Sequence, residues 1–383
     1  MLRKDSIETL LLCVYLVVFL CIPVSYSVAL FGIKVETLLP LFAGVISLFR
    51  TGRWSYSKLD FLVFFFFLSL LYSLAISEGV IEELRAILYL LTALAFSQVC
   101  LNVNSRKHVL STLCAISILA SHLYILNPGS WGQPEVKILA YEQRTVFGFV
   151  LGLGSAICFS RFLDSRNLFL LYCSIVSFVV LGISGARGAF LVYLITLAIL
   201  LRSGTKNVKF FGGVGAAFAL IGLSFFVSGE IMQRYFGLID LGIRSSTAYR
   251  LDLFLTALDS VKNLNFFGWP YEKYVDYVYR NTSQGYTHLY DGRFQADSDV
   301  VRILIRHGLI AFACYSIFVV SLVKCCKGLP KTAHIFVIYI ILCSVLDDIL
   351  SNPLGWMWIG VCLSFVKSRA ETVKKYESNI SSV

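Results

Sequence analysis

Long apolar runs separated by short polar connections dominate this chain. We predict twelve spans, at roughly residues 10–31, 35–49, 59–77, 84–101, 109–126, 144–163, 168–184, 187–202, 208–228, 300–323, 332–350 and 352–366. Several runs approach the roughly 20 apolar residues that cross a hydrocarbon core as a helix, and a backbone in lipid must pair its polar groups within the span. The pattern predicts an all-α polytopic membrane protein with about 12 transmembrane helices.

One long polar segment, residues 228–298, interrupts the apolar pattern. We therefore divide the chain into an N-terminal bundle of about nine spans (1–227), a large loop (228–298) and C-terminal spans with a tail (299–383). Inside the loop, Ser246 or Thr247 can cap a helix that runs to about Leu264. Apolar residues at helical spacing predict one stripe on it, formed by Leu251, Phe254, Leu255, Leu258 and Val261. We expect this helix to lie on the membrane or on the bundle.

Composition and charge agree with a membrane protein and predict its orientation. The chain is 57% hydrophobic and only 15% charged, which is too apolar for a soluble domain of this length. Its net charge of +10 is spread over the connections, not gathered in a stripe suited to nucleic acid. Basic connections alternate with acidic or mixed ones, so the positive-inside rule places both termini in the cytoplasm and the large loop outside. In a bacterium this means the inner membrane and a periplasmic loop.

Three arginines at the external ends of predicted helices are candidate binding residues. Arg144 opens the sixth span as Arg144-x-x-x-Gly148, and Arg187 follows the tight hairpin Ser184-Gly185-Ala186 at a helix start. The helix dipole disfavours a cation at that end, so a nearby anion would explain Arg187, although it could also reach lipid headgroups. Arg250 lies near the head of the loop helix, where a solvated helix face is the alternative.

A further charged group opens the tenth span. Asp299, Arg302 and Arg306 are spaced by 3, 4 and 7 residues, which predicts one shared helix face. Arg306 would lie about 10 Å along the helix from Asp299 at a rise of about 1.5 Å per residue. Charge at that depth usually faces a cavity. The alternative is an ion pair with Asp299 that only stabilises the helix start.

Several arginines from separate spans suit an anion with many oxygens, because guanidinium binds phosphate through paired, charge-assisted hydrogen bonds. The loop adds aromatic rings that could bind sugars: Trp269, Tyr271, Tyr274 and Tyr290. Ordinary loop packing is the alternative for each ring. Since no nucleotide-binding motif accompanies them, an external phosphate ligand indicates a lipid diphosphate. No Cys/His spacing indicates a metal site, and we expect no cofactor.

From about residue 140 to 325 the chain resembles the superfamily of bacterial O-antigen polymerases and O-antigen ligases, the Wzy/WaaL type. The similar pieces are Arg144-x-x-x-Gly148, the hairpin at 184–189, Arg250 followed by Asn265-Phe266-Phe267-Gly268-Trp269, and Asp297-Ser298-Asp299 leading into His307-Gly308-Leu309-Ile310. The resemblance implies a helical fold of the GT-C type, a glycan carried on undecaprenyl diphosphate, and no metal. It assigns the diphosphate to Arg144, Arg187 and Arg250.

The chain departs from the ligases at one place. Ligases carry a histidine near the end of the long loop, and here that place reads Asp297-Ser298-Asp299. This favours a polymerase of O antigen or capsule, and leaves the general base open among Asp299, Asp297 and His288. The alternatives are a ligase that transfers the glycan to lipid A–core and a flippase for lipid-linked oligosaccharides. The expected partners are the lipid-linked oligosaccharide, membrane lipids and a chain-length regulator, with no nucleic acid.

Overall fold

The computed structural model describes residues 6–21, 29–30, 33–34, 38–51, 58–76, 80–131, 135–138, 141–202, 246–263, 266–281, 298–326, 331–346 and 353–380. Four features predicted from the sequence lie outside these residues: the span at 208–228 and the candidates His288, Tyr290 and Asp297.

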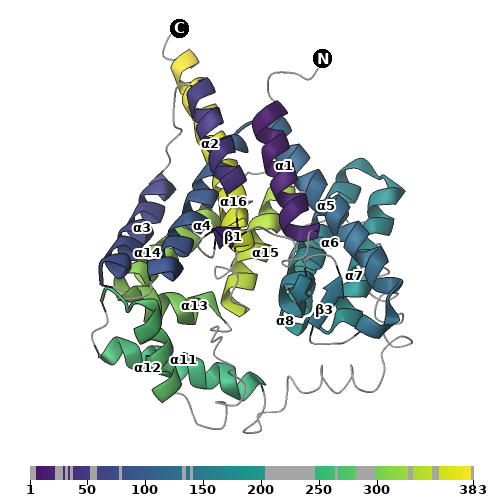
Figure 1. The fold of residues 1–383 in the computed structure, drawn as a ribbon. Coiled ribbons are helices and arrows are strands. Elements are labelled where there is room, and N and C mark those ends of the chain that lie inside the picture. Colours follow the sequence, from purple (N-terminus) through teal and green to yellow (C-terminus); the bar gives the residue numbers. More distant parts are fainter. Residues whose placement is uncertain are drawn as a thin grey trace. The chain divides into compact units, whose positions relative to one another are not determined.

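Helices form nearly all of the described chain (Figure 1). They are α1 (Ser6–Cys21), α2 (Leu38–Thr51), α3 (Lys58–Ile76), α4 (Val80–Val99), α5 (Val103–Ile125), α6 (Arg144–Ser165), α7 (Leu168–Ser184), α8 (Arg187–Arg202), α11 (Ser246–Lys262), α12 (Tyr271–Asn281), α13 (Asp299–Arg302), the π-helical turn η5 (Ile303–His307), α14 (Gly308–Cys326), α15 (Lys331–Leu346) and α16 (Pro353–Ile380). Pro128–Ser130 form the short 3₁₀ turn η3.

Two short antiparallel hairpins depart from the all-helical prediction. β1 (Ala29–Leu30) pairs with β2 (Ile33–Lys34), and β3 (Glu135–Ile138) pairs with β4 (Tyr141–Gln143). Both occur in connections between helices, so the helical architecture is unchanged.

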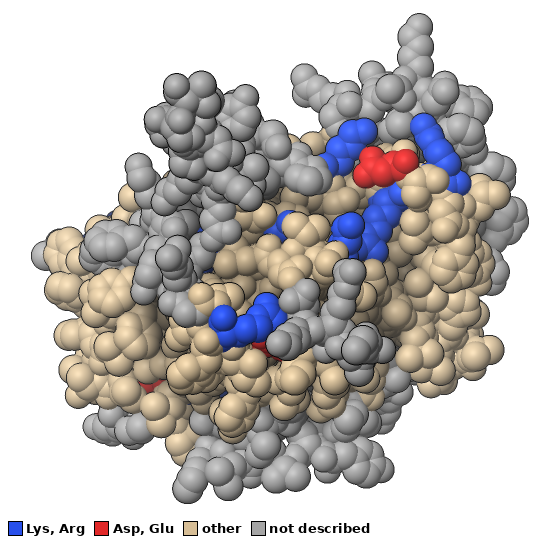
Figure 2. Space-filling model, turned by 90° about the horizontal axis from the view of Figure 1, so that it is seen from above, with Lys and Arg blue, Asp and Glu red and all other residues tan. Residues whose placement is uncertain are grey.

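By length and composition, three helical segments among the described residues can cross a membrane: Val103–Ile125, Val146–Ser165 and Asp299–Lys324. Shorter apolar helices accompany them, including Leu168–Ser184 and Lys331–Val345. The chain is therefore a helical membrane protein, while the number of twelve spans and their orientation remain predictions. Most charged side chains visible on the face shown in Figure 2 are Lys or Arg, in keeping with the positive net charge.

The chain forms two compact units. The first contains α1, α5 to α8 and most of α15, and α6 runs through its interior. Small and hydroxyl-bearing residues hold these helices close, as is usual in membranes. Ser155 and Ser174 hydroxyls lie 3.1 Å apart between α6 and α7. At Gly152 of α6 the missing side chain leaves a slot for Tyr339 of α15, whose hydroxyl would collide with any added Cβ.

The second unit contains α2 to α4, α11 to α14 and α16. Gly360 of α16 packs against the backbone of Ala93 in α4, and an added Cβ would lie 2.3 Å from the Ala93 carbonyl oxygen. Lys367 of α16 is buried and donates to the Ser97 hydroxyl of α4 at 3.1 Å.

The loop helix predicted after Ser246 exists as α11, but the face that packs differs from the predicted stripe. Its buried residues are Leu253, Thr256, Ala257 and Ser260. Leu253 and Ala257 join a core with residues of α12, α13 and η5, among them Tyr274, Val278, Val301, Leu304 and Ile305. Of the predicted stripe, Val261 packs against this core, whereas Leu251, Phe254, Leu255 and Leu258 are exposed. Helix α11 therefore docks on the second unit through its smaller residues.

Candidate functional site

Two of the motifs that resemble the family, Phe266–Trp269 and His307–Ile310, the latter with the preceding Arg306, meet backbone to backbone in the second unit. The Trp269 N–H donates to the Arg306 carbonyl at 2.9 Å, and the Ile310 N–H donates to the Phe266 carbonyl at 3.2 Å. Gly268 and Gly308 make this approach possible. Both have positive φ, 84° and 80°, and a Cβ on Gly268 would lie 2.1 Å from the Arg306 carbonyl oxygen.

The π-helical turn η5 supplies the carbonyl groups for this contact. The sequence predicts an uninterrupted α-helix here, but Ile303–His307 adopt the wider π form. Such turns interrupt the regular hydrogen-bond ladder and often mark functional sites. The Arg306 carbonyl is free to accept from the loop, and the His307 carbonyl accepts from the Ser69 hydroxyl of α3 at 3.3 Å. The turn thus joins the loop to α3.

Glu83 of α4 pairs with Arg306. Its Oε2 lies 3.1 Å from Arg306 Nη2, and the side chains are 0% and 8% exposed. Its Oε1 accepts the Tyr271 N–H at 3.1 Å, at the first residue of α12. A carboxylate at that position also interacts favourably with the dipole of α12. One carboxylate therefore connects α4, the arginine of η5 and the start of α12.

The Tyr271 ring covers the other side of this ion pair. Its centroid lies 5.1 Å from the guanidinium carbon of Arg306, a cation–π distance. Within the described residues, Arg306 Nε is buried and has no hydrogen-bond partner. Arg306 is thus held in place by Glu83 and Tyr271 while keeping one buried N–H donor for another acceptor.

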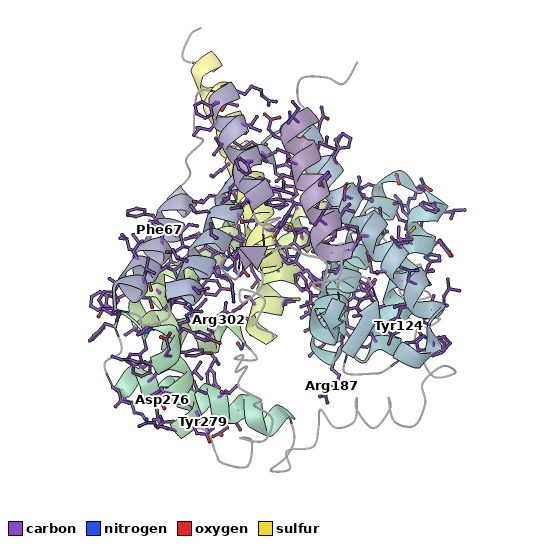
Figure 3. The ribbon with its side chains drawn as sticks, viewed as in Figure 1. Phe67, Tyr124, Arg187, Asp276, Tyr279 and Arg302 are labelled. Atoms are coloured by element: carbon purple, nitrogen blue, oxygen red, sulfur yellow. The ribbon has the colours of Figure 1, made fainter. Side chains whose placement is uncertain are left out.

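Asp299 and Arg302 are also buried, at the start of the same segment. Arg302 lies in α13 directly before the π turn (Figure 3). Ser298 occupies the N-cap position, yet its hydroxyl donates to the Val345 carbonyl at 2.9 Å and makes no cap bond. This polar bond fixes the start of α13 against the end of α15.

The candidate sugar-binding rings fall into two groups. Tyr274 is 1% exposed and packs in the core of the loop helices, so its ring offers no face to a sugar. Trp269 and Tyr271 are partly exposed, and the Trp269 ring lies 4.3 Å from the Tyr277 ring, centroid to centroid. Burial raises the pKa of Tyr277 above its ordinary value. Asp276 and Tyr279 lie on the outer side of α12 (Figure 3).

In the first unit, the motif around Gly148 packs on the hairpin that precedes Arg187. A Cβ on Gly148 would lie 2.2 Å from the Ala186 Cβ and 3.3 Å from that of Ala189. Gly185 ends α7 with φ 70°, and α8 begins at Arg187, as predicted. Figure 3 shows the Arg187 side chain at the end of its helix. Arg144 begins α6, one turn before Gly148.

Arg250 lies in the first turns of α11. Within the described residues no three His, Cys, Asp or Glu side chains are close enough to hold a metal ion. Sequence analysis did not identify Glu83 as a site residue. No local pattern identifies it, because its partners lie about 190 residues or more away in the chain.

These features define a helical membrane protein with a buried arginine site at the base of its large loop. Residues 172–316 are similar to the family Wzy_C, which is described as O-antigen ligase. Enzymes of this family transfer glycans from undecaprenyl-diphosphate-linked donors. A comparison with curated proteins gave no match.

Proposed function

We propose that the protein is a repeat-unit polymerase for a bacterial surface polysaccharide, O antigen or capsule, in the inner membrane. It moves a glycan from undecaprenyl diphosphate onto the next lipid-linked repeat unit on the periplasmic side. The family of residues 172–316 supports transfer of a lipid-linked glycan. The choice of polymerase over ligase follows from Asp297-Ser298-Asp299, which stand where ligases carry a histidine.

The buried Arg306 is the observation that carries this proposal. A guanidinium in a membrane protein is costly unless it serves a ligand or a partner. Glu83 neutralises one edge of the Arg306 guanidinium. The Arg306 Nε–H has no acceptor among the described residues, so it can donate to a ligand. Arg302, one turn earlier, adds a second buried cation. Together they suit a diphosphate, which accepts several charge-assisted hydrogen bonds.

The proposed reaction breaks the bond between the donor sugar C1 and the diphosphate oxygen and joins C1 to an acceptor hydroxyl oxygen. Arginines stabilise the negative charge that develops on the leaving undecaprenyl diphosphate, a form of electrostatic catalysis. The acceptor proton passes to a carboxylate or imidazole acting as general base. Asp299 is our first candidate for the general base, because it is buried, begins α13 and precedes Arg302 by three residues. Asp297 and His288 are the alternatives.

Arg144, Arg187 and Arg250 retain the diphosphate role that the resemblance assigns them. Arg187 has the strongest local support, because a cation at the start of α8 is unfavourable without an anion. Trp269 and Tyr271, partly exposed beside Arg306, are the candidate rings for the sugar.

The test is a deletion strain examined on a lipopolysaccharide gel. Loss of a polymerase leaves a single repeat unit on the core. Loss of a ligase, which the family description also allows, leaves bare core and lipid-linked glycan on the periplasmic side. Loss of a flippase leaves bare core with lipid-linked units on the cytoplasmic side. Bare core in the deletion strain would overturn the polymerase assignment.

A further inference from the structure

Helix α11 has three different sides. Its docked side contains Leu253, Thr256, Ala257 and Ser260. A second side is apolar and exposed, with Leu251, Phe254, Leu255 and Leu258 exposed by 55%, 43%, 52% and 43%. The third side contains Asp252, Asp259 and Asn263, spaced by seven and four residues. At about 100° per residue, the polar side lies about 110° from the exposed apolar side and about 90° from the docked side, and the docked and exposed apolar sides lie about 160° apart.

A helix in water does not keep a continuous apolar side beside a separate polar one unless something apolar covers it. A helix at a membrane surface keeps separate apolar and polar sides, because one side contacts lipid and another contacts water. In α11 the first side is already docked on the protein, so the exposed apolar stripe is a separate side from the packed one.

The exposed stripe of α11 leads toward apolar side chains on membrane helices. Phe266 and Phe267 follow α11 in the chain and are 43% and 57% exposed. The Phe267 ring lies 5.4 Å from the Tyr72 ring of α3, centroid to centroid. Phe266 accepts the Ile310 N–H of α14, and Tyr72 and Ile310 are themselves 43% and 42% exposed. Since α14 belongs to a candidate span, Phe266 lies beside an exposed apolar side chain of a helix long enough to cross a membrane.

We propose that a loop anchor, formed by Leu251, Phe254, Leu255, Leu258, Phe266 and Phe267, is embedded in the outer leaflet of the membrane. Lipid is the occupant because two residues of the anchor, Phe267 and Phe266, adjoin exposed apolar side chains of α3 and α14. Aromatic side chains at this level are typical of the membrane interface. In Figure 1, α11 lies below α13, at the lower end of the second unit.

The anchor would hold the large loop at the depth of lipid headgroups. This restricts the loop helices to the plane in which a lipid-linked substrate carries its phosphates. The anchor is a membrane-contact site whatever the sugar or the acceptor, so it does not depend on the assignment as a polymerase.

The test uses the single variants Leu255→Cys and Phe267→Cys in the full-length protein in its native membrane, with Asp259→Cys as the matched control on the polar side of α11. The parent protein, with its own cysteines, sets the background. We expect a charged, water-soluble maleimide to label Leu255→Cys and Phe267→Cys at least about tenfold more slowly than Asp259→Cys, because lipid excludes the reagent and raises the pKa of a thiol. A lipid-soluble maleimide should label all three.

Rapid labelling of all three variants by the charged reagent would show that the stripe faces water and would overturn the proposal. If neither reagent labelled Leu255→Cys and Phe267→Cys, protein would have to cover the stripe, and the proposal would also be overturned. A second measurement needs no substitution: a phospholipid with a photoreactive group in its acyl chain should form adducts on Leu255, Leu258 and Phe267 of the unaltered protein. Adducts on α14 without any on these residues would contradict the proposal.

Discussion

Glu83→Gln should destabilise the protein far more than removal of an exposed ion pair. The variant keeps the size of the side chain and an oxygen for the Tyr271 N–H, but leaves the charge of Arg306 buried at 8% exposure without its partner. Breaking a buried pair from one side costs about 3–5 kcal/mol. Arg306 cannot relieve this cost by losing its proton, since arginine stays charged in proteins.

Asp276→Asn is the matched control. Asp276 and Arg280 are 2.8 Å apart on α12, closer than Glu83 and Arg306, but their side chains are 53% and 73% exposed. Exposed pairs of this kind are worth about 0–1 kcal/mol. Distance alone would rank Asp276→Asn as the more harmful change, whereas burial ranks Glu83→Gln first.

The assay is the thermal stability of the detergent-purified protein, together with polymer length in a complemented deletion strain. Adding Arg306→Gln to Glu83→Gln should recover part of the lost stability, because the double variant has no buried charge left unpaired. Polymer should stay short in the double variant, because Arg306, the residue proposed to bind the diphosphate, is absent. Equal stability of Glu83→Gln and Asp276→Asn, or no recovery in the double variant, would refute the reasoning.

Gly308→Ala should displace the loop from η5 and lower the free energy of unfolding by more than about 1 kcal/mol, because residue 308 needs positive φ and the new Cβ would lie 2.3 Å from the Gly268 nitrogen. The control is Gly129→Ala, whose Cβ would meet only a side-chain oxygen at 3.7 Å. It should leave the stability unchanged in the same thermal assay. Arg187→Ala should abolish polymer on the gel while the protein is still inserted, and Arg187→Lys should restore little because lysine lacks the planar fork; full polymer from the Ala variant would make Arg187 only an anchor. Asp299→Asn should slow chain growth by at least about 10²-fold and His288→Ala less; the reverse order would identify the base as His288 and the site as ligase-like. Reporter fusions in the large loop and at the C-terminus should report opposite sides of the membrane, and a common side would disprove the predicted topology.

Local signals were sufficient to predict several helix boundaries. The spans at 168–184 and 187–202 coincide with α7 and α8. The Asn167 side chain accepts the Phe169 N–H at the start of α7, and Gly185 ends the helix in the left-handed conformation. Both capping residues can be identified from the sequence, because they lie within a few positions of the helix boundary.

Contacts between distant segments were not predictable in the same way. Periodicity finds the largest apolar stripe of α11, yet the helix docks through Thr256, Ala257 and Ser260, whose small size permits close packing. The π turn at Ile303–His307 has no composition signal of its own, and the distant loop backbone bonds to its Arg306 carbonyl. Glu83 likewise became a site residue only through the fold.

The slot at Gly152 has a consequence for the order in which the protein is made. Helices α5 to α8 leave the ribosome early and in succession, and the Ser155–Ser174 contact can form as soon as α6 and α7 are inserted. The slot stays open to lipid until Tyr339, synthesised 187 residues later (339 − 152), fills it and donates its hydroxyl proton to the Phe149 carbonyl at 3.3 Å. Assembly of the first unit is thus completed only after the large loop has been synthesised, so a chain truncated before α15 would remain an unfinished bundle open to quality-control proteases.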